Sequence, residues 1–300
     1  MKNAKLCVVT APYWHYTLEY AMNSIASSGF SSLELWAASP HYCYADYTQE
    51  ERQARRREIL AMMERYGLDM PVFYPEQMNK YPLNIASAEE EIRQFSLERV
   101  LEYVDDAALF GAESMLLGTG WQHLDAPSPE NRERAVSAIR TVSCRAEERG
   151  ITLLLEPAAP VLGSFVWDLD SLVRMLHDVG CANVKACLNL AFILERGESA
   201  ADWYSALNGR VGHVHFAGQG GRDPGSGSGV SGALRALDAL GYTGHLSLNI
   251  TFRDCCLTPD REVFRSGRWL SRQGFLPLPR PVSQEQCSKE LSAGDFRRTL

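Results

Sequence analysis

Short apolar segments recur along the whole chain, and each is followed by an amphipathic stretch. There are eight such segments, at residues 6–10, 32–36, 71–74, 114–118, 152–156, 184–189, 211–216 and 245–250. Each has the length of a strand and is almost continuously apolar, which is typical of strands in a parallel sheet that is covered on both faces. The stretches between them have helical spacing: Leu97, Leu101 and Val104, for example, fall on one stripe of a helix.

Eight successive strand–helix units predict an α/β protein with a closed (β/α)8 TIM barrel. Such a barrel commonly runs about 250 residues as one domain, so we expect residues 1–276 of the 300-residue chain to form a single domain. Glycines such as Gly67 and Gly180 stand where the predicted helices end, shortly before the next strand. The segment 277–300 begins with alternating prolines and then becomes polar, which predicts a poorly ordered C-terminal tail.

Composition and charge indicate a folded soluble domain and argue against several other classes of protein. The chain is 45% hydrophobic and 22% charged, with a net charge of -7 at pH 7, which is ordinary for a folded soluble domain and unfavourable for nucleic-acid binding. The arginine-rich run at 52–57 is flanked by glutamates and indicates a solvated helix face. No apolar stretch reaches the roughly 18 residues of a membrane span, and the first residues lack a signal-peptide pattern. Because the cysteines also lack metal or disulfide spacing, we expect a cytoplasmic protein that binds neither nucleic acid nor membrane.

Barrels of this kind carry their site at the C-terminal ends of the strands. The polar and aromatic residues at these ends, or in the loops after them, are Glu34, Trp36, His41, Glu76, Trp121, His123, Glu156, Asn189, His213, His215 and Asn249. Glu156 ends an apolar strand, where a carboxylate rarely serves the core, so it is a candidate acid or base, with a structural ion pair as the alternative. His213 and His215 share one face of their strand because strand side chains alternate.

The segments around these residues resemble the xylose-isomerase-like superfamily of sugar isomerases and epimerases. The resemblance covers about residues 1–275 and rests on GFSSLELW at 29–36, LEP at 155–157, HVH at 213–215 and GYTGHLSL at 241–248. Within that superfamily, Trp36 with Pro40 and His41, and the segment YPE at 74–76, are similar to ketose 3-epimerases and in particular to fructoselysine 3-epimerases.

The resemblance implies a divalent-metal site with two unusual positions. In the family, Glu, Asp, His and Glu from strands five to eight hold one metal ion, and the two glutamates act as acid and base. These positions fall on Glu156, Asn189, His215 and Asn249, so two anionic ligands are replaced by amides. One carboxylate neutralises little of a dication, and we therefore expect no metal cofactor. The alternative is manganese, cobalt or magnesium held weakly by these four residues. Leu162 and Phe192 also replace a glutamate and a histidine that the family often carries.

We expect an enzyme that transfers protons on a sugar-like or polyhydroxylated small molecule without a metal, with Glu156 as the base and His215 as its partner. The residues expected to bind substrate are Trp36, His41, Glu76, Trp121, His123, Asn189, His213 and Asn249. A metal-dependent ketose 3-epimerase with a poor ligand set is one alternative, and a non-catalytic barrel that binds a sugar or a protein partner is the other. Members of the superfamily are often dimers or tetramers, so the resemblance also implies a homo-oligomer.

Overall fold

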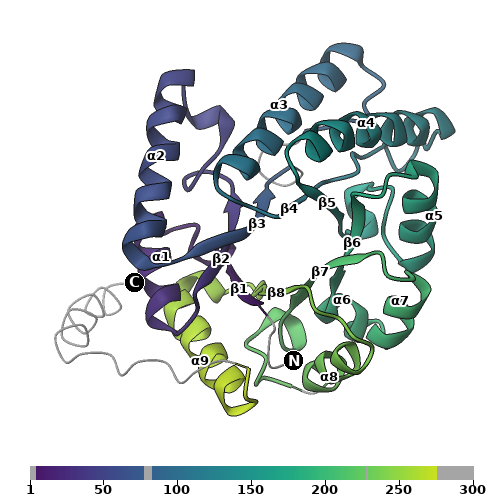
Figure 1. The fold of residues 1–300 in the computed structure, drawn as a ribbon. Helices are drawn as coiled ribbons and strands as arrows, with labels where there is room; N and C mark the ends of the chain where they lie inside the picture. Colours follow the sequence, from purple (N-terminus) through teal and green to yellow (C-terminus); the bar gives the residue numbers. More distant parts are fainter. Residues whose placement is uncertain (1–4, 78–82, 228, 276–300) are drawn as a thin grey trace.

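The computed structural model describes residues 5–77, 83–227 and 229–275, and within them the chain forms a closed barrel (Figure 1). The strands are β1 Lys5–Val9, β2 Ser32–Ala37, β3 Asp69–Pro75, β4 Ser114–Leu116, β5 Thr152–Leu155, β6 Val184–Asn189, β7 Val211–Phe216 and β8 His245–Leu248. They are parallel and follow one another in sequence order, and β8 closes the ring against β1. The predicted TIM barrel is therefore confirmed. The expected tail, 277–300, lies outside the described residues.

Helices surround the ring of strands on its outer side (Figure 1). They are α1 Leu18–Ser27, α2 Gln49–Tyr66, α3 Glu90–Leu109, α4 Pro129–Glu148, α5 Leu169–Val179, α6 Leu190–Glu195, α7 Ala200–Ala206, α8 Val230–Ala239 and α9 Pro259–Arg272. Local sequence fixes several of their ends. Thr48 and Glu51 form a capping box at the start of α2, and Gly67 ends that helix with a φ of 62°, a left-handed conformation that glycine adopts readily.

Alternation along each strand divides the apolar side chains into two layers. The larger layer packs between strands and helices and includes Leu33, Leu35 and Phe73. The barrel interior holds smaller clusters, of which one joins Val72, Leu116, Leu154 and Cys187 and another joins Val9, Trp36 and Ala38. Because inward-facing residues are two apart, the polar residues Glu34, His213 and His215 also face the interior.

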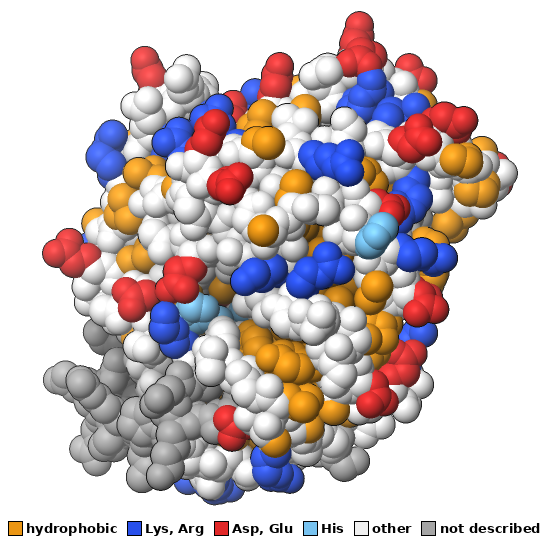
Figure 2. Space-filling view, turned by 45° about the vertical axis from the view of Figure 1, so that its right-hand side comes forward, with side chains coloured by type: hydrophobic (Ala, Val, Ile, Leu, Met, Phe, Trp, Pro, Cys, Tyr) orange, Lys and Arg blue, Asp and Glu red, His pale blue; other side chains and the backbone are white. Residues whose placement is uncertain are grey.

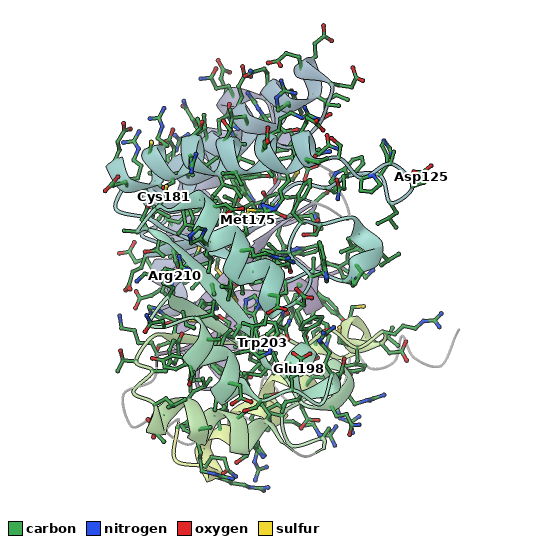
Figure 3. The ribbon with its side chains drawn as sticks, turned by 90° about the vertical axis from the view of Figure 1, so that its right-hand side faces the viewer. Asp125, Met175, Cys181, Glu198, Trp203 and Arg210 are labelled. Carbon is green, nitrogen blue, oxygen red and sulfur yellow. The ribbon has the colours of Figure 1, made fainter. Side chains whose placement is uncertain are left out.

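The strand ends define a mouth on one side of the barrel. Figure 3 views the molecule from the side: Asp125, in the loop after β4, projects at the edge opposite Cys181 and Arg210, which precede β6 and β7. Glu156 and Asn249 are the first residues after β5 and β8, and the backbone N–H of Asn249 still bonds Phe216 O at 2.9 Å. The barrel thus brings the predicted site residues to one end.

The surface shows no gathering of one charge on the face seen in Figure 2, where basic and acidic side chains are interspersed. Among the helices of the described segments, none combines the length and the apolar character needed to cross a bilayer.

Candidate active site

Four polar side chains from the ends of β5 to β8 meet at the mouth of the barrel. Glu156 Oε1 lies 2.9 Å from His215 Nδ1 and accepts a 2.9 Å hydrogen bond from Asn189 Nδ2. The side-chain nitrogen of Asn249 lies 3.4 Å from the same His215 Nδ1. The Glu156 side chain is 15% exposed whereas that of His215 is fully buried, so a ligand in the mouth reaches the carboxylate first. The structure therefore brings together the four residues that the resemblance placed in one site.

Directly beneath this group lies a second carboxylate, Glu34 of β2. Glu34 is completely buried, and it bonds both histidines of β7 across the barrel. Its Oε1 lies 2.9 Å from His215 Nε2, and its Oε2 lies 3.1 Å from His213 Nε2. The imidazole of His215 consequently has a carboxylate at each of its two nitrogens, Glu34 below and Glu156 above.

These contacts decide which groups are charged. Burial favours a higher pKa for Glu34, but the charge of His215 and the hydrogen bonds from both histidines outweigh burial and hold the pKa of Glu34 well below its usual value. Burial also opposes a charged His215, yet its neighbours Cys187, Glu156 and Glu34 raise its pKa well above the usual value. At His213 burial prevails and lowers the pKa. The site therefore contains an imidazolium at His215 and a neutral imidazole at His213.

The amide of Asn189 is oriented by the helix that follows it. Asn189 is the N-cap of α6, and its Oδ1 accepts a 3.1 Å hydrogen bond from the backbone N–H of Phe192. Since the cap uses the oxygen, the NH2 group points to Glu156. The ring of Phe192 lies 6.3 Å from the ring of Trp203, a residue of α7 that is labelled in Figure 3.

This donor set does not fit the metal site that the resemblance implies. Asn189 presents an amide nitrogen, which donates hydrogen bonds and has no lone pair for a cation. His215 Nδ1 already faces Glu156 Oε1, so this nitrogen is engaged within the cluster. Hard dications bind converging carboxylate and carbonyl oxygens, so the mouth offers one carboxylate where several are needed.

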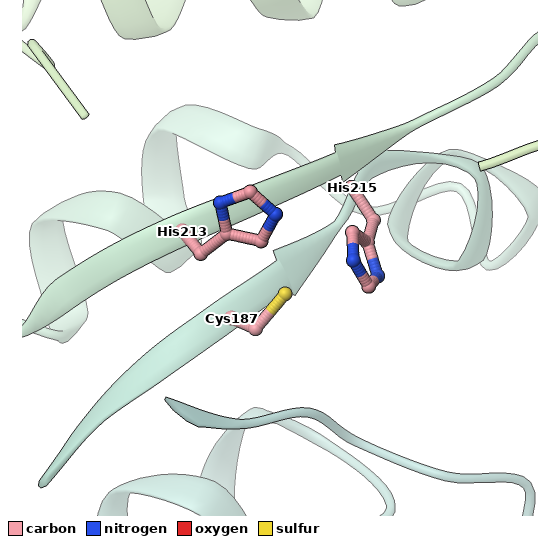
Figure 4. A group of neighbouring side chains, drawn as sticks. All are labelled: Cys187, His213 and His215. Atoms are coloured by element: carbon pink, nitrogen blue, oxygen red, sulfur yellow. The ribbon is translucent and has the colours of Figure 1, made fainter. Parts of the chain in front are cut away.

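A second group with metal-ligand side chains lies deeper in the barrel. Cys187 on β6 and both histidines on β7 point to one another, and their candidate ligand atoms lie within 4.8 Å (Figure 4). Burial raises the pKa of Cys187 to about 12, so the group is a thiol, whereas metals bind the thiolate. Glu34 occupies Nε2 of His213 and of His215. The cluster is thus a hydrogen-bonded unit in which a cation would have to displace Glu34.

Aromatic rings line the mouth beside the polar cluster. Trp36 donates its Nε1–H to Glu76 Oε2 at 3.2 Å, and both residues are largely buried. The rings of Trp14 and Trp36 are 6.2 Å apart, and that of Tyr74 is 5.9 Å from His215. Burial and the nearby Glu156 carboxylate raise the pKa of Tyr74, which keeps the phenol neutral. Apolar walls with a few polar groups are the usual lining of small-molecule sites.

The other predicted substrate residues lie in loops. His41 is buried, and its Nε2 lies 3.0 Å from both Tyr13 O and Tyr16 O, so it ties the loop after β2 to the loop after β1. Trp121 and His123 follow β4, and their rings contact each other with centroids 5.8 Å apart. Substrate binding by these three residues stays a prediction, as it does for Trp36, Glu76 and His213.

From the sequence alone, Glu34 is recognisable only as a strand-end residue, and Tyr74 has no predicted role. The signal at Glu34 was a carboxylate two residues before Trp36 on an inward-facing strand position. The sequence does not reveal its hydrogen-bond partners, because Glu34 and His213 are 179 residues apart in the chain and meet only when the barrel closes.

Comparison with known proteins agrees with the fold. A family model described as a xylose isomerase-like TIM barrel matches residues 22–273. Among curated proteins, fructoselysine 3-epimerase of Shigella flexneri is 21% identical over 253 residues, which cover 82% of this chain and 90% of that protein.

Solved structures of sugar epimerases share the fold. D-Psicose 3-epimerase from Clostridium cellulolyticum H10, determined with D-tagatose, has 18% identity and a TM-score of 0.72, covering 91% of this chain and 99% of the other. L-Ribulose 3-epimerase has 17% identity and a TM-score of 0.74, covering 91% and 94%. At such low identities the structural likeness establishes the fold.

Proposed function

Because the chain belongs to the xylose isomerase-like TIM barrel family, we propose that it is a sugar isomerase or epimerase that removes a proton beside a carbonyl group without a metal ion. One observation carries the proposal. The partly exposed carboxylate of Glu156 stands at the mouth with Asn189 Nδ2 and His215 Nδ1 each 2.9 Å from one of its oxygens. This leaves Oε2 as the oxygen available to a substrate proton.

The proposed reaction begins at a carbon next to a ketone or aldehyde. Glu156 takes the proton from this carbon, the C–H electron pair forms a C=C bond, and the carbonyl electron pair moves to oxygen. N–H groups of Asn189 and Asn249 donate hydrogen bonds to the substrate oxygens, where negative charge develops, while His215 remains the hydrogen-bonding partner of Glu156. The protonated Glu156 then returns a proton to the carbon while the electron pair on oxygen re-forms the C=O bond, so the base is regenerated and the atoms and charges balance over the cycle.

The substrate class follows from the relatives and from the lining of the mouth. The curated relative is a fructoselysine 3-epimerase, and the structural neighbours include D-psicose 3-epimerase and L-ribulose 3-epimerase. The rings of Trp36 and Tyr74 offer flat apolar surfaces beside hydrogen-bonding groups, which suits a polyhydroxylated small molecule. The cytoplasmic location and the homo-oligomer stay predictions.

Solvent isotope exchange tests the proposal. The chain, dialysed against a chelator, is incubated in D2O with D-fructose, D-psicose, D-tagatose, L-ribulose and fructoselysine, and NMR follows deuterium at the carbons beside the carbonyl. We expect exchange into at least one ketose, and its loss in Glu156→Gln. The matched control is Glu113→Gln, since Glu113 is an exposed residue before β4, on the side away from the mouth.

Two outcomes would contradict the proposal. Exchange that disappears with the chelator and returns with Mn2+ would assign the chain to metal-dependent ketose 3-epimerases. A sugar that raises the melting temperature without any exchange would make the barrel a non-catalytic binding protein, since ligands of the native state stabilise it whether or not they react.

A further inference from the structure

The buried carboxylate of Glu34 has no role in the proposed reaction steps. Glu34 has no exposed surface, does not reach the mouth, and yet holds both histidines of β7. A buried ion pair is weak evidence of stabilisation, because desolvation of the charges offsets their attraction. Stabilisation of the fold therefore does not by itself explain why Glu34 is buried against the two histidines.

Hydrogen-bond chemistry fixes the protons around Glu34. An ionised carboxylate only accepts hydrogen bonds, so the Nε2 atoms of His213 and His215, at 3.1 and 2.9 Å, must both carry protons. His213 Nδ1 is buried and has no hydrogen-bond partner among the described residues, which fits a neutral ring with its single proton on Nε2. Both oxygens of Glu34 are thus occupied by N–H donors.

The consequence for His215 lies at its other nitrogen. Nδ1 is 2.9 Å from Glu156 Oε1, and a contact of this length between a ring nitrogen and a carboxylate oxygen needs a proton between them. With Nε2 held as a donor by Glu34, Nδ1 is the nitrogen that faces Glu156. The ring is therefore fixed in orientation, like a histidine oriented by a carboxylate behind it.

We propose that Glu34 is a positioning residue of the reaction, which holds the ring of His215 through its Nε2–H so that Nδ1 faces Glu156 and the mouth. This inference rests on the proposed function, since it gives Glu34 its effect through the Glu156–His215 pair. Glu34 itself touches no reacting atom.

The substitution Glu34→Gln tests this directly because the amide has nearly the same shape. Its single oxygen accepts from one histidine only, and its NH2 group faces the other, which must then present a lone pair at Nε2. Glu34→Asp keeps the charge and is the conservative variant. Ser247→Ala is the matched control, since Ser247 is a buried residue of β8 that faces the same interior.

The first readout needs no turnover. In protein carrying 15N-labelled histidine, NMR shows which ring nitrogens are protonated. We expect the wild type to show His215 protonated at Nε2 and Glu34→Gln to change that state, with Glu34→Asp and Ser247→Ala remaining like the wild type. A wild-type His215 that lacks a proton at Nε2 overturns the inference, even if every variant fails to fold.

The second readout is the rate of deuterium exchange. We expect kcat to fall about 10- to 100-fold in Glu34→Gln while KM changes little, because Glu34 does not contact substrate. An unchanged kcat in a folded Glu34→Gln variant overturns the inference. If the wild type shows the expected protonation but exchanges no sugar, the proposed function fails while the structural role of Glu34 stands, so the two failures are distinguishable.

Discussion

Changing Asn189 to Asp and Asn249 to Glu together should turn the mouth into a metal site and destabilise the metal-free protein. Asn189 Nδ2 now lies 2.9 Å from Glu156 Oε1, so an aspartate would place an oxygen against an oxygen. Two unit charges about 4 Å apart repel by about 4 kcal/mol at an effective dielectric constant of about 20. His215 offsets part of this repulsion, and we expect a loss of a few kcal/mol in the unfolding free energy without metal.

A bound dication should reverse the loss. Metal at 100 times its dissociation constant contributes about 2.7 kcal/mol to the native state. In chains of about 150–250 residues, each kcal/mol shifts the melting temperature by about 2–4 °C. Mn2+ or Co2+ should therefore raise the melting temperature of the double variant by roughly 5–10 °C and leave that of the wild type nearly unchanged.

The assay is thermal unfolding with and without a chelator, together with elemental analysis of the purified proteins. Asn208→Asp is the control, because it adds a negative charge in the turn before β7, away from the mouth. A wild-type protein that is purified with about one equivalent of manganese or cobalt, lost when Glu156 or His215 is replaced, would refute the reasoning.

Two more predictions concern the pH dependence of stability and the contacts that hold the loop after β4. Burial lowers the pKa of His245 from 6.5 to about 4, so between these pH values the unfolded chain binds a proton that the folded chain excludes. The unfolding free energy should therefore fall with falling pH, by up to about 1.4 kcal/mol per pH unit, and His245→Asn should flatten this slope in urea denaturation; an equal slope in both proteins would contradict it. Asn84 accepts from Trp121 N at 3.1 Å and donates to Trp121 O at 2.9 Å. Asn84→Ala should lower stability by about 1–3 kcal/mol and speed hydrogen exchange at the Trp121 amide, whereas an unchanged exchange rate there would show that other contacts hold the loop.

The barrel could be predicted from the sequence because its signals are local. The expected segments 184–189 and 211–216 coincide with β6 and β7. The segment expected at 245–250 ends two residues earlier, at Leu248, since Asn249 has already left the strand. Strand-length apolar runs and helix-ending glycines are properties of neighbouring residues, so no knowledge of tertiary contacts was needed.

The site could be predicted only in part. The four mouth positions followed from the resemblance, and the structure brings them together. The link from Glu34 to both histidines spans the barrel and depends on the register of strands far apart in the chain. The direction of the Asn189 amide depends on the N–H of Phe192, a backbone group whose position is set by α6. Neither contact leaves a local pattern in the sequence.

The cap on α6 also explains how the fold tolerates an amide where its relatives are expected to carry a charge. Asparagine and aspartate cap helices about equally well, because the cap needs one acceptor oxygen and either side chain supplies it. The two residues differ only in the second atom, which here faces Glu156. An oxygen at that place would repel Glu156 unless a cation lay between them, whereas the N–H of Asn189 bonds Glu156 directly. The exchange therefore leaves the helix intact and places a hydrogen bond between Asn189 and Glu156, so the polarity of this position can change without any change in the barrel.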